Sequence, residues 1–122
     1  MLTLRPYQSA IIDETREHLR RVRRVLIQLP TGGGKTAIAS RMLHGAADRG
    51  RRVWFLCHRR ELVKQVSAAF TLDGLAHSIV AADQPMNANA MAQIASIPTL
   101  VKRAHLLPPP DLICWDECHH VA

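Results

Sequence analysis

The stretch that decides the fold covers residues 25–36 and reads VLIQLPTGGGKT. Residues 25–29 are mostly apolar and β-branched, which is typical of a buried strand. Proline and three glycines in residues 30–34 predict a loop. Over residues 35–49 apolar side chains recur at helical spacing, and Gly50 follows as a stop signal. The stretch therefore predicts a strand, a glycine-rich loop and a helix in succession.

A strand, a glycine-rich loop and a helix in this order indicate a phosphate-binding loop. Glycines let the backbone curl around an anion, and the helix adds the positive end of its dipole. Lys35 can then reach the β- and γ-phosphates of a nucleotide, while the Thr36 hydroxyl ligates Mg²⁺. Leu29 occupies the first glycine position of the strict pattern, and a glycine-rich turn that happens to precede a lysine is the alternative. The predicted nucleotide-binding residues are Pro30, Thr31, Gly32, Gly33, Gly34, Lys35 and Thr36.

Extended and helical patterns alternate along the rest of the chain. Further strands are predicted at residues 53–57, 78–81, 91–97 and 112–115, and further helices at residues 7–22, 61–70 and 99–104. This alternation implies an α/β fold with a parallel sheet flanked by helices. The length of 122 residues suits one domain. Trp54 and Trp115 lie within predicted strands and are expected in the core.

Two adjacent carboxylates, Asp116 and Glu117, end the last predicted strand. Ligands of open parallel sheets bind beyond the carboxyl ends of the strands, so the pair is expected to face the phosphate loop. Asp116 would hold Mg²⁺ together with Thr36, and Glu117 would polarise the attacking water. The alternative, a strand that simply ends in acidic turn residues, is weakened by the phosphate loop upstream. The predicted catalytic residues are Lys35, Asp116 and Glu117.

The charge balance suits a polyanionic partner. Sixteen Lys and Arg against ten Asp and Glu give a net charge of +6, and arginines cluster at residues 20–24, 49–52 and 59–60. Nucleic acid fits such a surface, although a solvated basic surface explains the charge equally well. No apolar run approaches the roughly 20 residues of a membrane span, and no signal-peptide core opens the chain. A cytoplasmic protein with free thiols at Cys57, Cys114 and Cys118 is expected.

Taken together, these motifs resemble the N-terminal ATP-binding lobe of superfamily 2 helicases of the DEAD/H-box kind. Residues 29–36 resemble motif I, in which this superfamily commonly lacks the first glycine, and residues 116–119 match motif II in its DExH form. Residues 57–65 resemble motif Ia. Residues 96–100 are similar to the stretch before motif II in the branch of DNA helicases and restriction-enzyme motors, with Pro98 where that branch usually has Gln.

The resemblance implies ATP and Mg²⁺ as cofactors and a nucleic-acid partner, with DNA favoured over RNA. Arg5, Tyr7 and Gln8 belong to a Q-like motif, which in the family recognises adenine. Arg59 and Arg60 belong to motif Ia, which in the family contacts the nucleic-acid backbone.

The same resemblance predicts a RecA-like P-loop NTPase lobe over residues 1–122. Because the sequence ends at Ala122, just after motif II, we expect the lobe to be incomplete and the C-terminal helicase lobe to be absent. The predicted function is ATP hydrolysis by a DNA helicase or translocase in a longer parent, with this fragment alone inactive. The alternatives are a P-loop ATPase without motor activity and a catalytically idle nucleic-acid-binding fragment.

Overall fold

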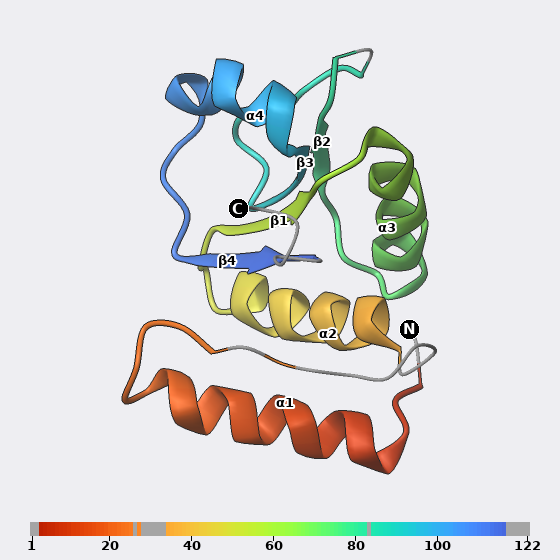
Figure 1. Ribbon diagram of the computed structural model, residues 1–122, viewed down its shortest axis with the longest axis vertical. Coiled ribbons are helices and arrows are strands. Elements are labelled where there is room, and N and C mark those ends of the chain that lie inside the picture. The colour runs from red at the N-terminus through yellow and green to blue at the C-terminus, as the bar shows by residue number, and fades with distance from the viewer. Residues whose placement is uncertain (1–2, 26, 28–33, 83, 117–122) are drawn as a thin grey trace.

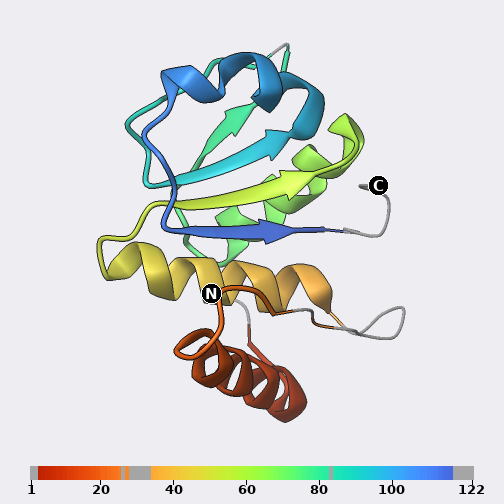
Figure 2. The same ribbon diagram turned by 60° about the vertical axis from the view of Figure 1, so that its left-hand side comes forward.

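The centre of the fold is a parallel sheet of four strands, found in a computed structural model that describes residues 3–25, 27, 34–82 and 84–116. The strands are β1 (Val53–Cys57), β2 (Ser78–Val80), β3 (Ala92–Ser96) and β4 (Leu112–Trp115), in the spatial order β2-β3-β1-β4. Each neighbouring pair is parallel. The carboxyl ends of the strands therefore share one edge of the sheet, which we call the carboxyl edge (Figure 2).

Helices cover both faces of this sheet (Figure 1). The helices α2 (Lys35–Asp48) and α3 (Arg60–Leu72) pack on one face, and the short α4 (Ile97–Arg103) with the 3₁₀ turn η1 (Ala104–Leu106) packs on the other. Because successive side chains of a strand point to opposite faces, β1 contributes to two cores. Phe55 belongs to the core beneath α2 and α3, whereas Leu56 belongs to the core beneath α4.

A third layer is formed by α1 (Pro6–Leu19), which lies on the side of α2 that faces away from the sheet (Figure 1). Pro6 occupies the first turn, where its missing N–H costs nothing. At the contact of the two helices the Arg16 guanidinium lies over Gly45 of α2, where a Cβ atom would be 2.6 Å from Arg16 Nη2.

Most elements that the sequence predicts are confirmed. The strands at residues 53–57 and 112–115 have the predicted ends, and β2, β3, α2, α3 and α4 lie where strands and helices are expected. The first helix begins one residue before the predicted start and ends at Leu19. The predicted fold class, a parallel α/β sheet flanked by helices, is therefore correct.

The strand predicted at residues 25–29 is not supported by the residues that the structure describes. Val25 and Ile27 lie outside any strand, and the other three residues fall outside the described part of the chain. Instead, Val25 and Ile27 line a hollow beside α1, together with Ile11 and Val22. A short apolar run buries against a helix as readily as in a sheet, and sequence periodicity alone does not separate the two cases.

The expected burial of Trp115 is wrong. Trp115 is 43% exposed and Ile113 is 41% exposed, so β4 is buried on one face only. The reason is its place at the end of the sheet. The helix α4 packs over β2 and β3, and it does not extend over β4. Trp54, on the more central β1, is half-buried against the core beneath α4.

Candidate functional site

The first turn of α2 carries the residues that the sequence predicts at the phosphates. Gly34 precedes the helix in the left-handed conformation, with φ of 78° and ψ of 38°, which a glycine adopts without strain. Lys35 is exposed and Thr36 is half-buried in the turn that follows. Four residues join the end of α2 to the start of β1, so α2 runs back along the sheet. Its positive N-terminal end therefore lies at the carboxyl edge (Figure 2).

Asp116 follows β4 at the same edge. Its backbone N–H donates to the Leu56 carbonyl oxygen at 3.1 Å, which extends the pairing of β4 with β1 by one residue. Leu112 and Cys114 pack against the core beneath α2 and α3. Because strand side chains alternate, Asp116 points to that same face.

The negative charge of Asp116 affects the pKa values of two buried thiols. Burial raises the pKa of the Cys57 thiol to about 12, and the negative charge of Asp116 adds to this rise. Burial raises the pKa of Cys114 to about 12 as well, again with Asp116 as the second cause. The carboxylate thus lies close enough to both thiols to act on them. These two cysteines are free, as predicted, and their thiols remain protonated at neutral pH, while Cys118 lies outside the described part of the chain.

Three of the predicted site residues therefore lie at the same edge of the sheet, on the face that α2 covers. Lys35 and Thr36 begin the helix that packs on β1 and β4, and Asp116 ends β4 on the face that this helix covers. A hydroxyl and a carboxylate are oxygen ligands of the kind that Mg²⁺ prefers. The predicted residues Pro30, Thr31, Gly32, Gly33 and Glu117 lie outside the described part of the chain.

Gln8 lies against the end of the glycine-rich loop. Its side chain is 6% exposed, and its Oε1 atom accepts the backbone N–H of Arg5 at 2.8 Å. A Cβ atom built on Gly34 would collide with Gln8 Nε2. The structure thus brings the Q-like segment and the start of α2 together, a contact that residue patterns did not predict. Arg5 and Tyr7 are exposed beside it.

We expect Gly34→Ala to disturb this contact, and Gly50→Ala provides a matched control. A Cβ atom built on Gly50, where φ is 81°, would have nothing within 4 Å, whereas Gly34 has a φ of 78° and faces Gln8. Left-handed backbone costs an alanine about 1–2 kcal/mol, so both variants should unfold more easily in urea. Only Gly34→Ala should lose additional stability, and adding Gln8→Ala should restore that part. Equal unfolding free energies for the two single variants would show that Gln8 does not press on Gly34.

Arg59 and Arg60 are exposed at the start of α3, directly after β1. They therefore lie at the carboxyl edge as well, one strand away from Asp116. Cations at a helix N-terminus oppose the helix dipole, and Glu61 in the first turn offsets this only in part. Two arginines at the positive N-terminal end of a helix form a surface suited to an anion.

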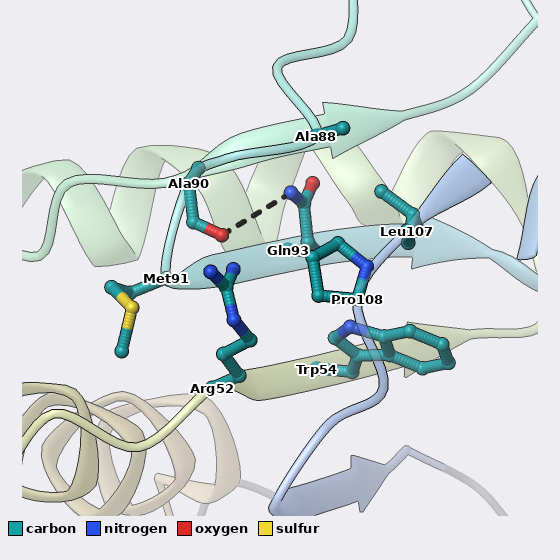
Figure 3. A pocket seen from close by; sticks show the side chains of 8 residues that line it. All are labelled: Arg52, Trp54, Ala88, Ala90, Met91, Gln93, Leu107 and Pro108. Atoms are coloured by element: carbon teal, nitrogen blue, oxygen red, sulfur yellow. Dashed lines mark hydrogen bonds between the residues drawn. The ribbon is translucent and has the colours of Figure 1, made fainter.

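A shallow recess lies on the face of the sheet that α4 covers, at the amino ends of β1 and β3 (Figure 3). Figure 3 shows Trp54 beside Pro108, and the Gln93 amide donating to the Ala90 carbonyl oxygen at 3.4 Å. The recess is too shallow to hold a water molecule. Trp54 is thus a packing residue here, and the recess is separate from the carboxyl edge.

The fold and this arrangement of residues define the class of RecA-like P-loop nucleotide-binding lobes. Over residues 1–122 the chain matches the family described as "Type III restriction enzyme, res subunit", and it belongs to this family. The resemblance to superfamily 2 helicases that the motifs indicate is confirmed by this match.

Two relatives are similar over most of the chain. A 51.5 kDa protein of a Lactococcus phage (isolate 7-9) is 33% identical over 95 residues, which cover 78% of this chain and 18% of the phage protein. A Saccharomyces cerevisiae protein, IRC3, described as a putative ATP-dependent helicase, is 30% identical over 130 residues, which cover 96% of this chain and 19% of the yeast protein. The chain thus spans about a fifth of the length of these relatives. The family is one of ATP-dependent, helicase-like motors. Every helix in the described residues is too short or too polar to cross a membrane.

Proposed function

We propose that this chain binds and hydrolyses ATP as one lobe of a motor that moves along or unwinds DNA. The observation that supports the proposal is that Lys35, Thr36 and Asp116 lie at the carboxyl edge, on the face covered by α2. In this proposal residues 1–122 form a nucleotide-binding lobe, and a second lobe of a longer protein completes the motor.

Each residue of the site has a distinct task in the proposal. The Lys35 ammonium neutralises charge on the β- and γ-phosphates, and the backbone of residues 30–34 surrounds them. Thr36 and Asp116 would hold Mg²⁺, which when bound neutralises the charge that develops on the phosphates. Glu117 accepts a proton from the attacking water. Arg5, Tyr7 and Gln8 would select adenine, because the Gln8 amide offers one donor and one acceptor to the base.

The nucleic-acid surface of the proposal is the start of α3. Phosphate oxygens would accept hydrogen bonds from Arg59 and Arg60, with the helix N–H groups behind them. The stretch at residues 96–100 and its similarity to the DNA-motor branch favour DNA over RNA. The start of α3 follows β1, and Asp116 follows the neighbouring strand β4. Nucleotide and nucleic acid would therefore occupy neighbouring parts of the carboxyl edge.

We expect Arg59→Ala to weaken binding of single-stranded DNA by a similar factor for every sequence, because phosphate contacts carry no base information. The slope of log K against log salt should fall by about 0.7 for the lost contact. Fluorescence anisotropy with matched DNA and RNA oligonucleotides at several salt concentrations measures both effects.

Arg49→Ala provides the control for this experiment. Arg49 is an exposed arginine at the opposite edge of the sheet, so its substitution removes the same charge away from the proposed surface. Equal losses in the two variants would mean that binding follows net charge alone. A loss that depends on base sequence would indicate base readout, and tighter RNA than DNA binding would overturn the proposed DNA preference.

A further inference from the structure

Four polar side chains join α2 to the end of α3, and we call them the Asp73 cluster: Ser40, Arg41, His44 and Asp73. The Asp73 side chain is fully buried. Its carboxylate accepts hydrogen bonds from Ser40 Oγ and from Arg41 Nη2, both at 3.2 Å. His44 Nδ1 lies 3.5 Å from Asp73 Oδ2. One buried carboxylate thus contacts three side chains on one face of α2.

The backbone at Asp73 is anchored by the way in which α3 ends. The Leu75 N–H donates to the Phe70 carbonyl oxygen at 2.9 Å, and the Gly74 N–H donates to that of Thr71 at 3.1 Å. With Gly74 at a φ of 75°, this is the hydrogen-bond pattern of a Schellman motif. Phe70 and Leu75 are both buried in the core beneath the two helices. The backbone of Asp73 is therefore fixed by contacts within α3 and its C-terminal turn, independently of the contacts that its side chain makes with α2.

Stability alone does not account for a buried carboxylate at this position. A negative charge at the C-terminal end of a helix opposes the helix dipole. Buried ion pairs can often be replaced by apolar residues of similar volume with no loss of stability. Hydrogen bonds depend on direction, whereas apolar packing does not. The Asp73 cluster therefore fixes α2 at one defined position along α3.

This connection has a specific place in the fold. The helix α2 begins with Lys35 and Thr36, and α3 begins with Arg60, directly after Arg59. Both helix starts lie at the carboxyl edge, and the Asp73 cluster ties the two helices together away from that edge. The hydrogen bonds of Asp73 therefore connect the helix that begins with Lys35 to the helix that begins with Arg60.

We propose that Asp73 is a positioning residue that couples the nucleotide site at the start of α2 to the nucleic-acid site at the start of α3. The inference rests on the proposed function of these two helix starts. Coupling between two sites is reciprocal, so DNA should change the affinity for ATP by the same factor by which ATP changes the affinity for DNA. Typical couplings change affinity by about 5- to 150-fold, and in this chain Asp73 carries the coupling.

The test measures this coupling ratio directly. Dissociation constants for a fluorescent, non-hydrolysable ATP analogue are determined for the 122-residue chain with and without saturating single-stranded DNA. We expect Asp73→Asn to bring the ratio of the two constants close to one, while each ligand alone binds nearly as in the wild type. The pair Ser40→Ala with Arg41→Met removes the same connection from the α2 side and should have the same effect. Far-UV circular dichroism identifies the variants that fold.

Asp48→Asn is the matched control, because Asp48 is also on α2 and lies 3.7 Å from His44 Nε2, but its side chain is 73% exposed. Its coupling ratio should remain that of the wild type. A wild-type ratio of one, or an unchanged ratio in the folded variants, would overturn the coupling role and leave the proposed function intact. A purely structural role would weaken both ligands and keep the ratio. Failure of the wild-type chain to bind the ATP analogue would overturn the proposed function, and this inference with it.

Discussion

Lys35→Ala is expected to lower the affinity for ATP by about 10- to 150-fold, because hydrogen bonds to charged groups contribute roughly 1.5–3 kcal/mol. Lys35 stands exposed in the first turn of α2, where the helix dipole already favours an anion. Removing its ammonium leaves the phosphates with the backbone N–H groups and Mg²⁺. Titration of the chain with a fluorescent ATP analogue measures the loss of affinity.

Hydrolysis should fall further than binding in this variant. Charge on the phosphates grows in the transition state, and loss of one preorganised donor costs about 10²–10³ in rate. Lys102→Ala is the control, since Lys102 is an exposed lysine on α4, on the opposite face of the sheet. Steady-state turnover is measured in a longer protein that includes this chain. Turnover near that of the wild type in Lys35→Ala would remove Lys35 from the site.

Glu117→Gln is expected to lower the rate of hydrolysis by about 10²–10⁴ and to leave ATP binding unchanged. The amide keeps the size and shape of the carboxylate, but it cannot take a proton from water. Glu117 lies outside the described residues, so this prediction rests on its place next to Asp116 in the sequence. Single-turnover hydrolysis and nucleotide titration separate the two effects.

The control for the second variant is Glu14→Gln, an equal change on the exposed surface of α1. It should alter neither binding nor hydrolysis. If Glu117→Gln bound ATP poorly while its bound ATP was still cleaved, Glu117 would belong to nucleotide binding and the attacking water would need another base. The two variants together separate phosphate binding from proton transfer. Lys35→Ala should lower both ATP binding and hydrolysis, whereas Glu117→Gln should lower hydrolysis alone.

The sequence alone determined the type and order of most elements. Strands such as residues 53–57 are short, apolar and bounded by polar residues, so local pattern suffices to identify them. The amphipathic spacing of residues 61–70 identifies α3 for the same reason. The candidate site could be predicted from the order of the elements along the chain. In a parallel sheet, the loop that precedes a helix and the acidic residue that follows a strand both lie at the carboxyl edge. The structure places Lys35, Thr36 and Asp116 at that edge.

Burial and long-range contacts were decided only by the tertiary structure. Trp115 is half-exposed because β4 is the end strand and α4 covers its neighbours, and strand order is not written in a local pattern. Gln8 lies against Gly34, far along the chain, because α1 packs on α2. In the sequence, Asp73 and Gly74 indicate only that a helix ends there. In the structure, Asp73 is buried beside Ser40 and Arg41. Such contacts join residues distant in sequence, so they depend on how the layers stack, which periodicity does not encode.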